Sequence, residues 1–197
     1  MRYTPGMRLP TVSRREALVA LAAAAVAPAA LAELPPPPPG SARYHVEIVV
    51  FRQPGAPPPP LPAEPLTAGV TIPGRVFALT DSDWQLAGAA SSLARRGYPV
   101  LAHAAWFAVV PPNGRTTAHL EELLPPDSAI TGSVAVQRGQ YLYLGVELDY
   151  RPAGNPQAGA AEVVYSLREK RRVKYGERHY FDHSAFGAIV TIGNPHA

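Results

Sequence analysis

Strict alternation of apolar and polar side chains over residues 140–150 constrains the fold more than any other feature of this sequence. Successive side chains of a β-strand point to opposite faces, so such a strand has one apolar face and one polar face. The apolar set is Leu142, Leu144, Val146, Leu148 and Tyr150, and the opposite set is Tyr141, Tyr143, Glu147 and Asp149. One solvent-exposed face is typical of an antiparallel sheet, because parallel sheets are covered on both faces.

Further strands are predicted along the chain. Residues 131–138 precede the alternating segment across Gly139, which predicts a β-hairpin. Residues 43–51 begin with one polar face and become apolar on both, as an interior strand does. Residues 98–110 predict a long apolar strand that carries His103, and residues 188–192 predict another.

Residues 81–97 predict the main helix of the fold. Ser82 and Gln85 have the spacing of a capping box at its start, and Gly97 suits a left-handed stop at its end. One apolar stripe is expected along it, made of Leu86, Ala90, Leu93 and Ala94. Residues 111–129 are expected to form a connector with a short acidic helical piece at 119–124.

These elements together predict an α+β fold with a mostly antiparallel sheet and one main covering helix. The order of strand, helix, strand and then a run of strands suggests a ferredoxin-like or related two-layer sandwich. We expect a single domain over residues 43–192, followed by a short tail at 193–197.

The N-terminus has the features of a secretory signal peptide over residues 1–32. Four arginines precede an apolar run at 17–27, and the run is followed by an Ala-x-Ala pattern at 30–32. The run is too short to span a bilayer, and the paired arginines at 14–15 leave the general secretory and twin-arginine routes open. Five consecutive prolines then predict a polyproline spacer at 33–42. We expect an exported protein with no transmembrane segment after signal cleavage.

The formal net charge of +3 conceals an uneven distribution. Removal of residues 1–32 takes away four of the 18 Lys and Arg residues and one of the 15 Asp and Glu residues, which leaves 14 of each. Residues 168–178 hold six of these cations against two carboxylates, so the rest of the exported chain carries 8 basic and 12 acidic groups. A nucleic-acid-binding protein needs a broader basic field, and we expect no nucleic-acid partner.

The basic segment can be interpreted in two ways. In an extended strand, alternate cations share one face, and these are Arg168, Lys170, Arg172 and Lys174. The first interpretation is an edge strand whose charges prevent aggregation. The second is a docking strip for an extended anionic polymer or an acidic partner, with Tyr175, Tyr180 and Phe181 offering flat surfaces for sugar rings.

Histidines near the C-terminus raise the question of a metal site. His179, Asp182 and His183 could share one side of a helix. We favour a structural role, with Asp182 as the N-cap of a short helical turn and His183 in its first turn. A metal-dependent hydrolase built on His45, His103, His179 and His183 is the minor alternative, since the first two are expected to line the sheet.

No motif for catalysis or for cofactor binding stands out. The sequence contains no cysteine, no Gly-x-Ser-x-Gly elbow, no phosphate loop and no dinucleotide fingerprint. We therefore expect a binding protein rather than an enzyme, with no catalytic residue, no metal and no cofactor.

Three blocks of the sequence resemble the CsiV family of periplasmic proteins. They are residues 44–51, residues 97–106 and the segment Arg171-Arg172…Gly176-Glu-Arg-His-Tyr-Phe-Asp-His183…Phe186-Gly187, with 132–144 between the last two. The resemblance covers residues 43–192 and implies peptidoglycan binding, a role in cell shape, and cooperation with a cell-wall synthase or its lipoprotein activator. The apolar segment 107–109 departs from the polar stretch usual in the family, which puts any partner contact there in doubt.

The resemblance supplies no binding residues, so the candidate site comes from this sequence alone. The candidate ligand-binding residues are Arg168, Lys170, Arg172, Lys174, Tyr175, His179 and Tyr180. The alternative hypothesis is a protein–protein adaptor of an envelope complex that uses an exposed sheet edge and binds no glycan.

Overall fold

The structure is a computed structural model that describes residues 38–55, 75–152 and 163–194. The chain divides into two units, residues 1–35 and residues 36–197, and all of the described residues belong to the second. The expected signal peptide, residues 33–37 of the proline-rich spacer and the last three residues of the tail lie outside the described residues.

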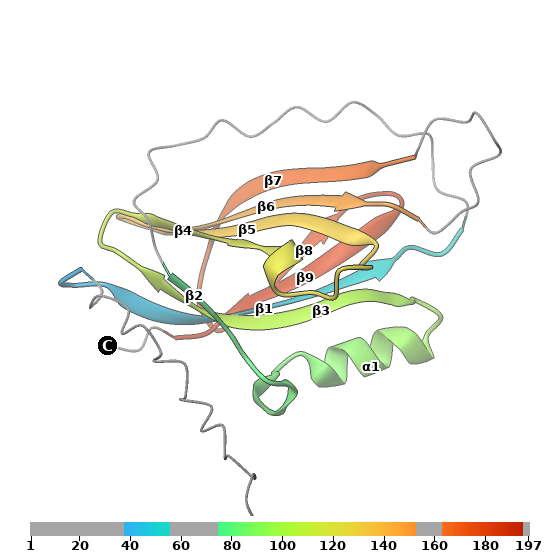
Figure 1. Cartoon of the computed structure of the whole chain (residues 1–197), viewed down its shortest axis with the longest axis horizontal. Coiled ribbons are helices and arrows are strands. Elements are labelled where there is room, and N and C mark those ends of the chain that lie inside the picture. Colours follow the sequence, from blue (N-terminus) through green and yellow to red (C-terminus); the bar gives the residue numbers. More distant parts are fainter. Residues whose placement is uncertain (1–37, 56–74, 153–162, 195–197) are drawn as a thin grey trace, which may run out of the picture. The chain divides into compact units, whose positions relative to one another are not determined.

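Nine strands in the described part of the chain form two antiparallel sheets (Figure 1). The five-stranded sheet has the order β2-β3-β1-β9-β8 and contains β1 (Ala42–Arg52), β2 (Arg75–Ala78), β3 (Val100–Val110), β8 (Arg178–Asp182) and β9 (Phe186–Ile192). The four-stranded sheet has the order β4-β5-β6-β7 and contains β4 (Arg115–His119), β5 (Ile130–Arg138), β6 (Leu142–Tyr150) and β7 (Tyr165–Val173). The helical elements are the 3-10 turns η1 (Asp81–Asp83) and η2 (Leu120–Glu122) and the helix α1 (Ala87–Arg95).

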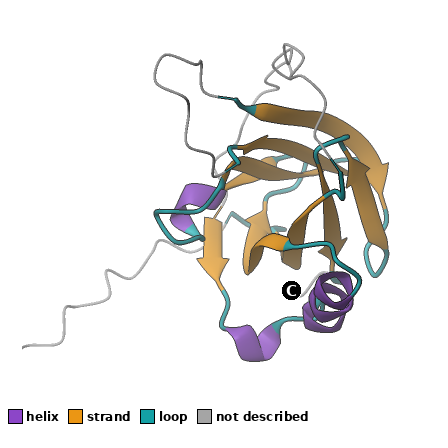
Figure 2. Cartoon of the chain, turned by 90° about the vertical axis from the view of Figure 1, so that its right-hand side faces the viewer, coloured by secondary structure: helices purple, strands orange, loops and turns teal. Residues whose placement is uncertain are grey.

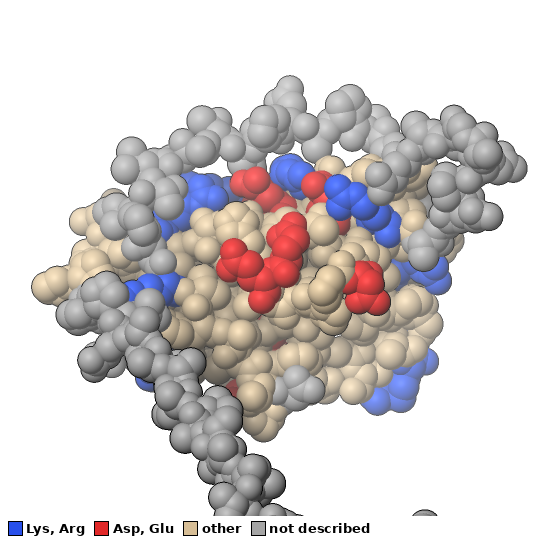
Figure 3. Space-filling view, in the orientation of Figure 1, with Lys and Arg blue, Asp and Glu red and all other residues tan. Residues whose placement is uncertain are grey.

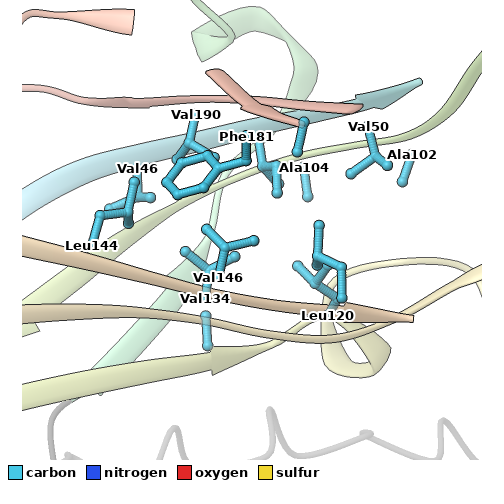
Figure 4. Close-up of a cluster of buried hydrophobic side chains, with 14 of the residues drawn as sticks. Val46, Val50, Ala102, Ala104, Leu120, Val134, Leu144, Val146, Phe181 and Val190 are labelled. Atoms are coloured by element: carbon cyan, nitrogen blue, oxygen red, sulfur yellow. The ribbon is translucent and has the colours of Figure 1, made fainter. Parts of the chain in front are cut away.

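The hydrophobic core lies between the two sheets, where apolar side chains of facing strands meet (Figure 4). Val46 and Val190 of the five-stranded sheet and Leu144 and Val146 of the other sheet are buried there. Each fully buried aliphatic or aromatic side chain stabilises the fold by about 1.5–3 kcal/mol. The alternation predicted for residues 140–150 is confirmed, because every second residue of β6 faces this core.

Strand β1 is buried on both faces, as predicted for an interior strand. Its inner residues face the core, and on its outer face Glu47 binds the backbone N–H groups of Gln85 and Leu86, just before α1. The helix packs against β3 on the side of the five-stranded sheet that faces away from the core (Figures 1 and 2). The predicted α+β class is confirmed: strands are mostly antiparallel, one α-helix covers them, and two layers enclose the core. The second layer is itself a sheet.

The predicted start of the helix is wrong. Residues 81–83 form a 3-10 turn, and the helix begins at Ala87 after the N-cap Leu86, which provides no side-chain cap. The predicted end is confirmed, because Gly97 has the left-handed φ of 82° that stops a helix. A long-range contact, described below, takes the place of the expected capping box.

Two further differences concern short segments. Residues 115–119 of the expected connector form β4, while the helical piece expected at 119–124 is confirmed as η2. The helical turn expected after Asp182 is wrong, because His183 and Phe186 exchange backbone hydrogen bonds of 3.0 and 3.2 Å that close a hairpin between β8 and β9. His183 Nδ1 accepts a hydrogen bond from the N–H of Ala185 inside this tight turn, which suits a structural role.

Candidate functional site

Residues 168–173 of the basic segment lie in β7, an edge strand of the four-stranded sheet, and residues 174–177 form the turn that leads to β8. Tyr165, Leu167 and Val173 are buried on the inner face of β7, and Lys170 and Arg172 are exposed on its outer face. The predicted alternation is therefore confirmed. Both interpretations of the segment start from this placement, because a charged edge strand and a docking strip present the same cations to solvent. In Figure 3, Lys and Arg side chains lie along the margin where β7 lies in Figure 1, with Asp and Glu side chains between them.

Arg168 is already neutralised within the protein. Its guanidinium lies 2.7 Å from Oδ1 of Asp149 and donates a second hydrogen bond of 2.7 Å to the carbonyl oxygen of Leu148. The hydroxyl of Ser166 donates to the same carboxylate oxygen at 2.6 Å. Arg168 therefore joins β7 to β6, and it has less capacity to bind an external anion than the cations further along the strand.

Lys170 and Arg172 instead contact tyrosine rings of β6 and its preceding turn. The Lys170 ammonium lies 5.5 Å from the ring centroid of Tyr143 and donates a 2.7 Å hydrogen bond to the side-chain oxygen of Gln137. The Arg172 guanidinium lies 3.5 Å from the ring centroid of Tyr141. Among the described residues, no carboxylate lies within 4 Å of either cation. Each cation is thus held by an aromatic face and keeps its charge available to solvent.

A pocket of about 360 Å³ lies at the end of this row of cations. Its lining comprises Gln140, Tyr141, Leu142, Arg172, Val173, Lys174, Tyr175 and Glu177. Lys174 and Tyr175 are exposed, and the Lys174 ammonium is only loosely paired with Glu177 at 3.9 Å. We call the surface formed by Lys170, Arg172, Lys174, Tyr141, Tyr143 and Tyr175 the basic strip.

The structure does not bring the other two candidate residues to the basic strip. His179 Nε2 lies 3.0 Å from the backbone carbonyl oxygen of Lys174, so the imidazole supports the chain behind the strip. Tyr180 lies on the outer face of the five-stranded sheet, paired across β8 and β9 with Ile189. The expectation that Phe181 offers a flat surface is wrong, because its side chain is fully buried and covered by the guanidinium of Arg171.

No pattern in the sequence connects Tyr141 and Tyr143 with the basic strip. Both are predicted on the polar face of residues 140–150, and in the structure Tyr141 is exposed and Tyr143 is partly exposed. The missing information was the register of β6 against β7, which sets Tyr143 opposite Arg172. That register brings aromatic faces and cations together on one sheet surface.

A buried carboxylate, Glu47, lies on the other sheet beneath the start of α1. It is fully buried, and its oxygens accept hydrogen bonds from the N–H groups of Gln85 at 2.6 Å and Leu86 at 2.8 Å. His103 Nε2 lies 2.7 Å from the same carboxylate, and the ring of Trp84 lies 4.0 Å from the His103 ring. Burial alone would raise the pKa of Glu47, but the hydrogen bonds from His103 and the two backbone groups lower it.

Glu47 therefore holds the segment before α1 against β1, and it replaces the local capping box that the sequence suggested. Its hydrogen-bond partners are two backbone amides and one imidazole, and together they occupy both carboxylate oxygens. We interpret the cluster as an anchor for the helix. His45 and His103 lie on β1 and β3, as expected for residues that line the sheet.

The described residues contain no group of three or more His, Cys, Asp or Glu side chains placed to hold a metal ion. None of the helices that the structure describes has the length and apolar character needed to span a membrane.

Comparison with known proteins identifies the family. The model of a family described as "Peptidoglycan-binding protein, CsiV" matches residues 62–195, more than half of the 197-residue chain. Searches of curated proteins and of solved structures found no significant match. The matched range includes the whole four-stranded sheet, the helix and the β8–β9 hairpin. The chain therefore belongs to the CsiV family of peptidoglycan-binding proteins.

Proposed function

We propose that this protein is a non-enzymatic periplasmic protein that binds peptidoglycan through the basic strip and supports cell-wall synthesis and cell shape. The observation that carries this proposal is the pair Lys170 and Arg172, two exposed cations that contact tyrosine rings and have no carboxylate partner among the described residues. The periplasmic location rests on the family and on the signal-peptide features of residues 1–32.

The chemistry of the strip suits the acidic groups of the cell wall. Peptidoglycan is an extended glycan whose stem peptides carry carboxylates, and its repeat can present several anions in a row. Stacking on Tyr141 occupies one face of the Arg172 guanidinium, while its N–H donors lie in the plane of the group. A carboxylate can approach in that plane and form a paired hydrogen bond.

Affinity should come from several weak contacts on one polymer. An exposed ion pair contributes about 0–1 kcal/mol, and salt screens it. A polymer that offers many copies of the same anion raises the effective concentration at each further cation. We therefore expect binding to intact sacculi to be measurable and to weaken as salt rises.

Co-sedimentation with purified sacculi tests the proposal. The variant Lys170→Glu/Arg172→Glu should lose most of the bound fraction at low salt. The matched control is Arg95→Glu/Arg96→Glu, which reverses two exposed cations near the end of α1 and changes the net charge equally. Equal recovery of wild type and the strip variant, or equal loss in both variants, would contradict a specific role for the strip.

A protein–protein adaptor is the second candidate, and the position of β7 at the edge of the four described strands favours it. β7 is the last strand of its sheet and extends over nine residues, which gives an incoming strand a backbone edge to pair with. A cell-wall synthase or its lipoprotein activator is the partner that we propose for this edge. Co-purification of such a partner from an extract cleared of sacculi, with no binding to sacculi alone, would support the adaptor instead of the wall-binding function.

A further inference from the structure

Tyr180 forms a flat aromatic surface on the outer side of the five-stranded sheet, away from the basic strip. Its ring is nearly parallel to the ring of Phe51, with an angle of 12° and 6.1 Å between centroids. Tyr98 meets Phe51 edge-on at 5.8 Å. A Cβ atom at position 187 would lie 2.9 Å from Cε2 of Tyr180, so glycine there allows the tyrosine ring to lie over β9.

Only one side of this aromatic group is covered. Phe51 beneath is 4% exposed, whereas Tyr180 is 44% exposed. Tyr180 thus presents a ring face to solvent, and the strand pairing and the buried Phe51 hold that face in a fixed direction. A single exposed aromatic side chain is ordinary on a protein surface, and a site requires polar groups that give it an orientation.

Gln53 and Asp182 supply those polar groups at the edge of the ring. The Tyr180 hydroxyl donates a 2.6 Å hydrogen bond to Oδ1 of Asp182. The Gln53 amide nitrogen lies 2.8 Å from the tyrosine oxygen and 3.0 Å from the same carboxylate oxygen. This triangle fixes all three side chains. It leaves Oδ2 of Asp182 and the amide oxygen of Gln53 without a hydrogen-bond donor among the described residues, so both can accept from a ligand.

We infer that this Tyr180 platform, made of Phe51, Tyr98, Tyr180, Gln53 and Asp182, binds an uncharged sugar residue. The C–H face of a pyranose ring can stack on the negative face of the exposed tyrosine ring, since aromatic faces attract polarised hydrogens. Hydroxyl groups at the rim of the same sugar can donate to the free oxygens of Gln53 and Asp182.

The charge of the platform separates it from the basic strip. Asp182 gives the platform a carboxylate and would repel a carboxylate ligand, whereas the strip presents cations on the outer face of the other sheet. The platform therefore suits the neutral sugar of a glycan, while the strip suits acidic groups. The two surfaces are independent, and the inference does not depend on the function proposed for the strip.

Titration of the intact protein with chitotetraose, an uncharged oligosaccharide, tests the inference by nuclear magnetic resonance. Saturable shifts are expected at Gln53, Tyr180 and Asp182, with a dissociation constant of about 1 mM. Tyr180→Leu removes the flat face and should weaken binding by about tenfold. Tyr180→Phe keeps the face and should retain most of the affinity. Gly187→Ala keeps every polar group but displaces the ring, and it should weaken binding as the leucine variant does.

Two controls distinguish the platform from the strip. Affinity for the neutral ligand should be unchanged between about 50 mM and about 500 mM salt, because no ion pair is involved. It should also be unchanged in Lys170→Glu/Arg172→Glu, whether or not that variant binds sacculi. The inference is overturned by absence of saturable shifts at the platform up to about 10 mM ligand, by shifts centred on the strip, or by equal affinity in wild type and Tyr180→Leu.

Discussion

Replacement of Glu47 by glutamine tests whether this buried carboxylate holds α1 in place. Glu47 accepts two backbone hydrogen bonds and one from His103, with distances of 2.6 to 2.8 Å. A glutamine has a single acceptor oxygen, and its NH₂ group would face at least one N–H donor. A hydrogen bond to a charged group contributes about 1.5–3 kcal/mol, and a buried donor left unpaired adds a penalty. We expect the free energy of unfolding to fall by about 2–4 kcal/mol.

The measurement is urea unfolding at pH 7, followed by circular dichroism and by tryptophan fluorescence. Trp84 contacts His103, so its emission should also report the local change. Glu147→Gln is the matched control, because it makes the same substitution at a partly exposed position on β6 and should change stability by less than about 0.5 kcal/mol. Faster hydrogen exchange at the amides of Gln85 and Leu86 should accompany the loss of stability in Glu47→Gln.

The pH dependence of stability tests separately whether the ionised form of Glu47 stabilises the folded protein. The pKa of Glu47 is lowered in the folded protein from its ordinary value of 4.5, so its stabilising effect is complete above that value. The effect is lost as pH falls through the lower, folded pKa. The stability difference between wild type and Glu47→Gln should therefore be largest near neutrality and should shrink below pH 4.5. A difference of less than about 0.5 kcal/mol at pH 7 would refute the proposed anchor.

Three further predictions concern two glycines and a tyrosine. Gly132→Ala should lower the free energy of unfolding by about 3 kcal/mol or more, because φ is 123° and a Cβ would lie 2.1 Å from the carbonyl oxygen of Glu147. Gly176→Ala has a positive φ but open space, so thermal melting should show a loss of only about 1 kcal/mol. Burial and the hydrogen bond to Asp182 raise the pKa of Tyr180 to about 12 from 10.0. Absorbance titration against Tyr180→Phe should show this late ionisation, and wild type should lose relative stability as pH rises from 10 toward 12.

The faces of the strands were predictable from the sequence because a period of two is a local property. Residues 140–150 and the basic segment both show it, and the structure places their apolar residues inward as expected. The start of α1 was not predictable in this way. Its amides are bound by Glu47, which lies 39 residues before Leu86, and no local pattern reports such a contact.

The candidate site was predictable only in part for the same reason. The cations of β7 could be assigned to one face, but their tyrosine partners depend on the register between two strands. Tyr180 could be recognised as an aromatic residue near the basic segment. The turn at residues 174–177 carries β8 into the other sheet, so Tyr180 points away from the cations that precede it in sequence. Asp182 and Gln53 become its neighbours through the β1–β9–β8 pairing.

The pairing of β1 with β9 has a consequence for the order of folding. β1 is the first described strand and β9 the last, and they are adjacent in the five-stranded sheet. A sheet that pairs the first described strand with the last has high contact order, which slows folding because a long loop must close first. If the chain crosses a membrane from its N-terminus onward, β1 can pair with β3 early, but its other edge stays open until residues 186–192 arrive. Truncation of those residues would then leave a chain with an exposed, strongly apolar β1 edge that is prone to aggregation.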